Sequence, residues 1–114
     1  MRHEMKLKAE PFYKIKSGLK TVELRLYDEK RQAIAVSDEI LFTLVYGDET
    51  LLCEVLSIHR FDSFAELYSA LPLSSLGYTD AEIPEASPYD MERYYSREEM
   101  QKYGVCGIRI RVFE

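Results

Sequence analysis

Five short strand-like stretches constrain the fold of this 114-residue chain more than any other feature. In the first, second and last of them apolar and polar residues alternate, and alternation with a period of two places successive side chains on opposite faces of a β-strand. The stretches span residues 3–8, 20–27, 38–46, 50–60 and 105–113. Between the third and fourth lie Gly47, Asp48 and Glu49, which favour a tight turn and therefore a β-hairpin.

Signals for short helices lie between these strands. Pro11 suits the first turn of a helix, and Gly18 supplies the backbone conformation that ends it. Ser63 and Ser96 each precede a glutamate by three residues, which is the spacing of a capping box. We therefore predict helices that open at these two serines and end near residues 70 and 103.

The remaining connections are irregular in length and composition. Residues 28–31 are predicted as a charged connection, and residues 72–90 as a loop with room for a helical turn. This arrangement lacks the regular strand–helix alternation of a doubly wound sheet. The predicted fold class is α+β, a small mixed β-barrel of about five strands with short helices covering its ends. Because no internal repeat or linker divides the chain, residues 1–114 are interpreted as a single domain.

Composition disfavours several classes of protein. No apolar run approaches the roughly 18–20 residues of a membrane span, and residues 1–6 lead into alternating sequence rather than an apolar signal region. We therefore expect a cytoplasmic protein with no membrane partner. Cys53 and Cys106 lie inside predicted strands and are interpreted as small buried residues. With two histidines, no compact ligand pattern and no glycine-rich phosphate loop, the sequence predicts no metal and no cofactor.

The distribution of charge is more informative than the net charge of -5. Residues 1–31 contain nine Lys or Arg and five Asp or Glu, whereas the rest of the chain contains six and fifteen. Basic charge gathered in the first quarter favours an anionic ligand there. Tight nonspecific binding of duplexes depends on many phosphate contacts, to which an acidic chain is poorly suited. The pattern thus favours a local binding pocket over a broad nucleic-acid track.

The strongest candidate for chemistry is the segment that follows Gly18. On the predicted strand, Glu23 and Arg25 lie two residues apart on one face, and the long side chain of Lys20 can swing to the same mouth of the barrel. An arginine forks onto a phosphate or a base edge, a glutamate accepts from an exocyclic amine, and a lysine adds a mobile charge. A solvated strand face with an ordinary ion pair is the alternative, and spacing alone leaves both open.

Further candidates surround this segment. Thr21 and Tyr27 share the predicted strand face with Glu23, and Tyr27 could stack on a base, as aromatic residues do in single-stranded RNA sites. The alternative for Tyr27 is to cover the end of the barrel. Asp28 and Arg31 extend the charged cluster into the next connection, where a solvated turn is the alternative.

The last third of the chain is rich in tyrosine. Tyr94 and Tyr95 directly precede the Ser96 cap, so one of them can point inward and the other toward the cleft. We take Tyr94 as a candidate for stacking on a ligand. Packing in the core or in a hydrophobic staple remains the alternative.

Residues 11–25, PFYKIKSGLKTVELR, resemble the opening signature of the ASCH domain, a branch of the PUA-like superfamily. Residues 26–31, LYDEKR, and 36–42, VSDEILF, continue the resemblance. Residues 103–108, YGVCGI, are similar to the closing strand of the family, so the likeness covers nearly the whole chain. The family usually has glycine where this chain has Ser37.

The resemblance implies a PUA-like β-barrel with helices over its ends and a cleft lined by the strand Gly-x-Lys-Thr-x-Glu-x-Arg. Such domains are generally taken to bind RNA, or to act on nucleotides or modified nucleosides. The resemblance therefore favours a functional interpretation of Lys20, Glu23 and Arg25. From it we expect an RNA- or nucleotide-binding domain linked to RNA metabolism or translation regulation, with the oligomeric state left open.

The alternative is a small hydrolase acting on a modified nucleoside, such as an acylated cytidine, or on an RNA phosphodiester. Related bacterial acetylcytidine amidohydrolases carry a lysine in this motif and use a threonine three residues later as nucleophile. Lys20 matches that lysine, but Glu23 stands at the position of the threonine, so the same mechanism is not expected. In this alternative Glu23 is the general base and Lys20 stabilises developing negative charge.

Overall fold

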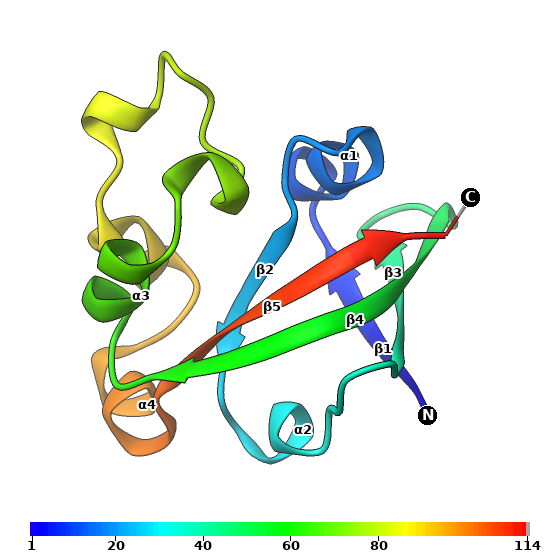
Figure 1. Ribbon diagram of the computed structural model, residues 1–114, viewed down its shortest axis with the longest axis horizontal. Coiled ribbons are helices and arrows are strands. Elements are labelled where there is room, and N and C mark those ends of the chain that lie inside the picture. The colour runs from blue at the N-terminus through cyan, green and yellow to red at the C-terminus, as the bar shows by residue number, and fades with distance from the viewer. Residues whose placement is uncertain (114) are drawn as a thin grey trace.

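The computed structural model describes residues 1–113, which form a five-stranded sheet and a series of short helices. The strands are β1 (Arg2–Leu7), β2 (Val22–Leu26), β3 (Glu39–Leu44), β4 (Thr50–Phe61) and β5 (Val105–Val112). The α-helices are α1 (Ala9–Ser17), α2 (Glu29–Gln32), α3 (Phe64–Ala70) and α4 (Arg97–Tyr103). Three 3-10 helices, η1 (Leu73–Leu76), η2 (Ile83–Glu85) and η3 (Pro88–Arg93), lie between α3 and α4. The predicted α+β class is confirmed (Figure 1).

The sheet is mixed and curves into a half-barrel. Its strand order is β1-β3-β4-β5-β2, in which β1 and β3 are parallel and the other neighbours are antiparallel. Figure 1 shows the long strands β4 and β5 crossing in front of β2 and β1. The two edge strands, β1 and β2, are joined by a hydrogen bond that Arg25 Nη2 donates to the Lys6 carbonyl oxygen at 2.9 Å. This bond spans the open side of the half-barrel.

Two apolar clusters bury both faces of β2. Val22, Leu24 and Leu26 pack against the helices that follow β4, including the buried residue Leu67 of α3. The opposite face of β2 is turned toward the interior of the half-barrel. Cross-strand pairing places its polar residues beside the main core, because Glu23 pairs with Ile108 and Arg25 pairs with Cys106. The strand therefore carries its ionic residues into the protein instead of into solvent.

Local signals in the sequence position the predicted helices. Gly18 adopts a left-handed conformation with φ of 86° and ends α1. The Ser63 hydroxyl accepts from the Glu66 N–H and opens α3, and Ser96 forms a full capping box with Glu99 at the start of α4. Both of these helices are confirmed with the expected ends. None of the helices within residues 1–113 is long and apolar enough to cross a membrane.

Two connections differ from the prediction. Residues 28–31, predicted as a charged connection, contain the cap and most of α2, because the Asp28 carboxylate accepts from the Arg31 N–H. Residues 72–90 contain more than one helical turn. Pro84 and Pro88 lie in the first turns of η2 and η3, where the N–H that proline lacks would have no partner within the helix. These prolines therefore mark the starts of short helices and not only a loop.

Candidate ligand-binding cleft

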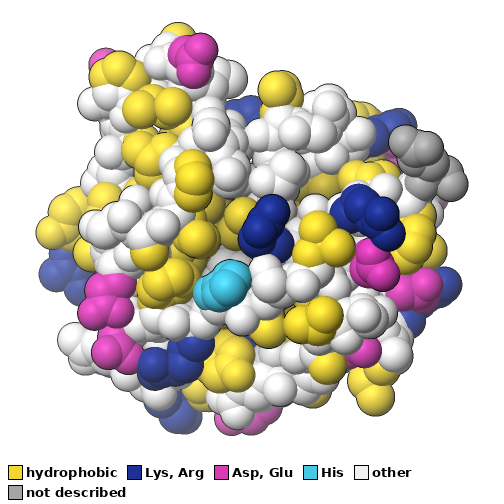
Figure 2. Space-filling view, viewed as in Figure 1, with side chains coloured by type: hydrophobic (Ala, Val, Ile, Leu, Met, Phe, Trp, Pro, Cys, Tyr) yellow, Lys and Arg dark blue, Asp and Glu magenta, His cyan; other side chains and the backbone are white. Residues whose placement is uncertain are grey.

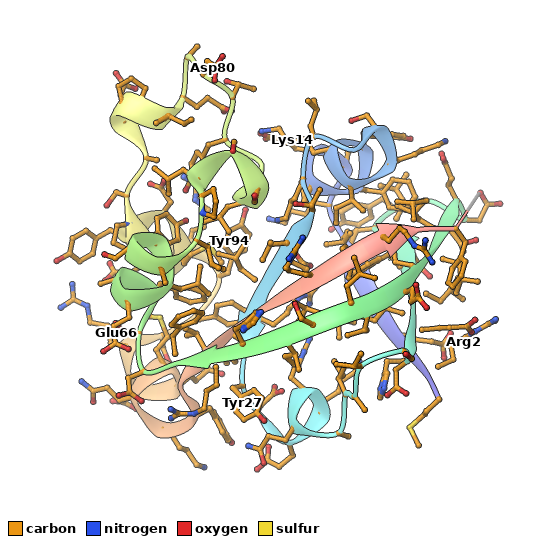
Figure 3. The ribbon with its side chains drawn as sticks, viewed as in Figure 1. Arg2, Lys14, Tyr27, Glu66, Asp80 and Tyr94 are labelled. Atoms are coloured by element: carbon orange, nitrogen blue, oxygen red, sulfur yellow. The ribbon has the colours of Figure 1, made fainter. Side chains whose placement is uncertain are left out.

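A cleft of about 480 Å³ lies between the half-barrel, α1 and the segment of helices and turns formed by residues 62–103, called here the helical segment. Figure 2 shows the outline of the molecule indented between α1 and the helical segment. In Figure 3, Lys14 lies on α1 and Tyr94 lies on the helical segment, on either side of this gap. The volume is within the range of about 300–1,000 Å³ that is typical of small-ligand sites.

Positive charge predominates on the cleft wall although the chain as a whole is acidic. The basic lining side chains are those of Lys6, Lys8, Lys14, Lys20, Arg25 and Arg93. The acidic ones are those of Glu10, Glu23, Glu82 and Asp90. Five of the six come from the basic first quarter of the sequence. Lys14 lies in α1, Lys20 just before β2 and Arg25 within β2, whereas Lys6 and Lys8 flank the last residue of β1.

Glu23 lies at the centre of the ionic residues on β2 and is 3% exposed. Its Oε1 is 3.1 Å from Lys20 Nζ and accepts from the Leu24 N–H at 3.2 Å. Its Oε2 accepts from Arg25 Nε at 3.0 Å and from Arg25 Nη2 at 2.8 Å. The carboxylate is therefore surrounded on both oxygens by N–H donors, and the predicted convergence of these three side chains is what the structure shows.

The electrostatic balance keeps Glu23 ionised. Burial by itself would raise the pKa of Glu23, but the charges of Lys20 and Arg25 and their hydrogen bonds offset burial, so the pKa lies below its ordinary value. A carboxylate with a lowered pKa and occupied oxygens is a weak general base, because an effective base has a pKa near the working pH. The geometry suits Glu23 to holding two cations in place.

Lys20 and Arg25 retain donors that face the cleft. The Lys20 side chain is 11% exposed and, among the described residues, its one anionic partner is Glu23. Arg25 uses Nε and Nη2 for Glu23 and the Lys6 carbonyl, which leaves Nη1 without a partner within residues 1–113. The backbone of Gly77 passes close to Lys20, and a Cβ at this position would lie 3.2 Å from Lys20 Cδ. Two nearly buried cations with spare N–H groups can bind an anion.

Tyr94 and Tyr95 divide between the cleft and the core. Tyr95 stacks on Phe64, with ring centroids 6.1 Å apart and an interplanar angle of 17°. Tyr94 remains 49% exposed and lines the cleft, with Lys8 Nζ 5.6 Å from its ring centroid. The tyrosine pair thus has one ring against the helices and one ring at the rim.

The structure does not bring the other predicted site residues to the cleft. Thr21 is exposed outside it, and its backbone N–H donates to the Ser75 carbonyl. Tyr27 lies at the far end of β2 beside α2 (Figure 3). Asp28 caps α2 and pairs with Arg31, whose Nη1 is 3.0 Å from the Asp28 carboxylate. These charges serve a local turn at the opposite end of the strand from Lys20.

Sequence reasoning missed a polar chain on the helical segment. The Tyr68 and Tyr78 hydroxyl oxygens are 2.7 Å apart, and Tyr78 donates to Asp90 Oδ2 at 2.7 Å. All three residues line the cleft. No sequence motif identifies these three residues, because Tyr68 lies in a predicted helix and the other two lie in a region predicted as loop. Within residues 1–113, no group of three or more His, Cys, Asp or Glu side chains could hold a metal ion.

Comparison with known proteins assigns the class. The model of the ASCH domain matches residues 5–113, and the chain belongs to the ASCH domain family. The crystal structure of the hypothetical protein PH0355 is similar, with 33% identity over 99% of this chain and 100% of that chain and a TM-score of 0.83. The solution structure of PF0455 from Pyrococcus furiosus has 33% identity over 100% and 99% of the two chains and a TM-score of 0.71.

A more distant structure shows the same fold. A mutant of ZmASCH from Zymomonas mobilis is 17% identical over 96% of this chain and 68% of that chain, with a TM-score of 0.66. At this identity the likeness concerns the fold alone. No curated protein matches the sequence.

Proposed function

We propose that this ASCH domain binds RNA or a nucleotide-like ligand in the cleft, in the service of RNA metabolism or translation regulation. One observation carries the proposal: the spare donors of Lys20 and Arg25 and the exposed ring of Tyr94 line the same cleft. Guanidinium and ammonium groups form charge-assisted hydrogen bonds with phosphate, and an exposed aromatic ring stacks on a base. A nucleotide needs both kinds of contact within one site.

The rim of the cleft adds unpaired positive charge. Lys6, Lys8 and Arg93 are exposed, and none of them forms an ion pair within residues 1–113. Lys14, in contrast, is held by Glu10 and Glu82, with Nζ–Oε1 distances of 3.3 Å to each. Unpaired cations at the rim favour the approach of a polyanion and make its binding sensitive to salt.

Binding is better supported than hydrolysis with Glu23 as base. That role requires a carboxylate with free lone pairs and a pKa near neutrality, whereas Glu23 accepts on both oxygens and has a lowered pKa. Lys20, the proposed stabiliser of developing charge, is likewise engaged with Glu23. These contacts preserve the shape and charge of a binding wall.

Arg93 offers the cleanest test of the proposal. Arg25→Ala is expected to weaken binding by about 1–3 kcal/mol, but it also removes a partner of the buried Glu23. Arg93 is exposed and unpaired among the described residues, so Arg93→Ala is expected to leave folding intact. In fluorescence anisotropy, Arg93→Ala should weaken the binding of a short single-stranded RNA. It should also reduce the slope of log affinity against log salt concentration by about one, which corresponds to the loss of one phosphate contact.

Arg97 provides the matched control. It lies outside the cleft lining on the same segment and pairs with Glu92 at 2.9 Å. Arg97→Ala should bind RNA like the wild type at every salt concentration. Equal affinities of the Arg93→Ala and Arg97→Ala proteins would contradict the proposed site. The absence of saturable binding by the wild-type protein to a panel of short RNAs and nucleotides would contradict the proposed function.

A further inference from the structure

A chain of two hydroxyls and a carboxylate forms part of the cleft wall on the helical segment. Tyr68 lies on α3, Tyr78 follows η1, and Asp90 lies in η3. The Tyr68 and Tyr78 oxygens are 2.7 Å apart, and Tyr78 is 2.7 Å from Asp90 Oδ2. Both tyrosines are partly buried.

The direction of the chain follows from the number of protons available. An ionised carboxylate can only accept hydrogen bonds, and Asp90 Oδ2 also accepts from the Ser87 N–H at 3.2 Å. The single proton of the Tyr78 hydroxyl is therefore donated to Asp90. The contact between the two tyrosines then requires Tyr68 to donate to Tyr78. Because its one proton is committed, the Tyr68 oxygen has only lone pairs to offer to a ligand.

The chain is held in this direction by its surroundings. The rings of Tyr68 and Tyr78 meet edge to face, with centroids 5.9 Å apart at an interplanar angle of 68°. Asp90 is fixed by the capping box that it forms with Ser87 at the start of η3. Burial and the neighbouring Asp90 raise the pKa of Tyr68 and, more strongly, that of Tyr78, so both hydroxyls keep their protons at neutral pH.

An acceptor at this place contrasts with the ionic residues of β2 and of the segment just before it. Lys20 and Arg25 present donors, and the oxygens of Glu23 are already accepting from them. Phosphate oxygens satisfy the donors but cannot satisfy the Tyr68 oxygen, since a phosphodiester has no proton to give. A ligand that fills the cleft must supply a hydrogen-bond donor there or leave a half-buried acceptor unpaired, which is unfavourable.

We propose that the Tyr68 hydroxyl is a specificity-determining acceptor that selects ligands carrying a hydrogen-bond donor beside their phosphate. The inference rests on the proposed function of the same cleft and names what the cleft reads. In a nucleotide this donor is either the ribose 2′-hydroxyl or the exocyclic amine of a base. A 2′-hydroxyl is what distinguishes RNA from DNA, and an amine distinguishes cytosine from uracil.

The test compares four short single-stranded oligomers: oligo(rC), oligo(dC), oligo(rU) and oligo(dU). Anisotropy titrations give the ratio of affinities between them for the wild type and for Tyr68→Phe, which keeps the ring. If the 2′-hydroxyl is read, the wild type prefers both RNAs over their DNA counterparts; if the amine is read, it prefers both cytosine oligomers. In either case the expected preference is about fivefold, the scale of one hydrogen bond.

Tyr68→Phe is expected to reduce the ratio of affinities between favoured and disfavoured oligomers to nearly one. Its affinity for the disfavoured oligomers should stay within about twofold of the wild-type value, because only the favoured ligand donates to the missing oxygen. Tyr78→Phe leaves the Tyr68 hydroxyl in place but frees its proton, so the preference should also fall. Tyr89→Phe, an exposed tyrosine outside the cleft lining, should match the wild type.

An unchanged preference in Tyr68→Phe would overturn the inference, and so would an equal loss of affinity for all four oligomers, which indicates a purely structural role. Either result leaves the proposed function standing, since the wild type binds. Failure of the wild type to bind any of the oligomers would instead contradict the proposed function and this inference together.

Discussion

A carboxylate taken out of water must replace its hydration with ion pairs and hydrogen bonds, or it is protonated. Glu23 meets this requirement with N–H donors on both oxygens. The same contacts restrain Lys20 and Arg25, two long side chains that would otherwise explore many rotamers. At the scale of single residues, Glu23 therefore prepares the cleft for an anion by fixing its cations in advance of binding.

Replacing Glu23 by glutamine is expected to destabilise the protein by about 3 kcal/mol at neutral pH, because Lys20 and Arg25 are left nearly buried without a counter-charge. The pKa of Glu23 is lowered in the folded protein, so its contribution is present above the unfolded pKa of about 4.3 and is lost as pH falls through the folded pKa. The difference between wild type and Glu23→Gln should therefore shrink on acidification.

Urea unfolding at a series of pH values measures this difference. Glu54→Gln is the control, since Glu54 pairs with the largely exposed Arg111 and should contribute little. A Glu23→Gln protein as stable as the wild type at neutral pH would contradict the role assigned to Glu23. So would a loss of stability that stays constant from neutral to acidic pH.

The connection between α2 and β3 shows how one backbone conformation constrains an element boundary. Ser37 adopts a left-handed conformation with φ of 77°, and its N–H donates to the Val55 carbonyl at 2.9 Å. This conformation is unfavourable for residues with a Cβ and favourable for glycine. It gives a physical reason for the glycine that the ASCH family usually has at this position.

Ser37→Gly is expected to raise the free energy of unfolding by about 1 kcal/mol, through relief of this strain. Ser69→Gly is the matched control. Ser69 lies inside α3, where glycine should lower the free energy of unfolding by about the same amount. Denaturant unfolding of both variants measures whether Ser37→Gly raises the free energy of unfolding and Ser69→Gly lowers it. Destabilisation by Ser37→Gly would show that the serine hydroxyl matters more than the backbone conformation.

Elements were predictable from the sequence where their signals are local. Alternation identified three strands, the Gly47–Glu49 turn identified the hairpin of the other two, and the serine caps identified α3 and α4. All of these signals depend on neighbouring residues. The short helices were less visible. The Asp28 cap of α2 was interpreted as part of a charged connection, and proline was interpreted as a sign of loop in the segment that forms η2 and η3. Such short helices depend on a few local contacts and are too short to show a periodic pattern of apolar residues in the sequence.

The site was predictable in part for the same reason. Lys20, Glu23 and Arg25 share one strand and its entry, so strand geometry and the family resemblance together identified them. The burial of Glu23 could not be predicted from the spacing of the residues, because it depends on how the half-barrel closes around β2. Tyr68, Tyr78 and Asp90 meet only in the folded protein, and no local pattern brings them together.

At the scale of the whole molecule, the cleft and the outer face of β4 and β5 differ in charge. The cleft gathers most of the basic residues from the first quarter of the chain. The face presented by β4 and β5 carries basic, acidic and apolar side chains interspersed (Figure 2). On that face Arg111 is paired with Glu54, and Arg109 is its one exposed arginine without an ion pair within residues 1–113. An anionic ligand is therefore expected at the cleft.

The most direct test of this account is a nuclear magnetic resonance titration of the backbone amides with a short single-stranded RNA. The largest chemical-shift changes are expected at residues that line the cleft, including Lys8, Lys20, Leu24 and Tyr94. Amides on the outer face of β4 and β5 should shift little. Changes concentrated around Arg111 instead, or no changes at saturating RNA, would contradict the claim that the cleft is the binding site.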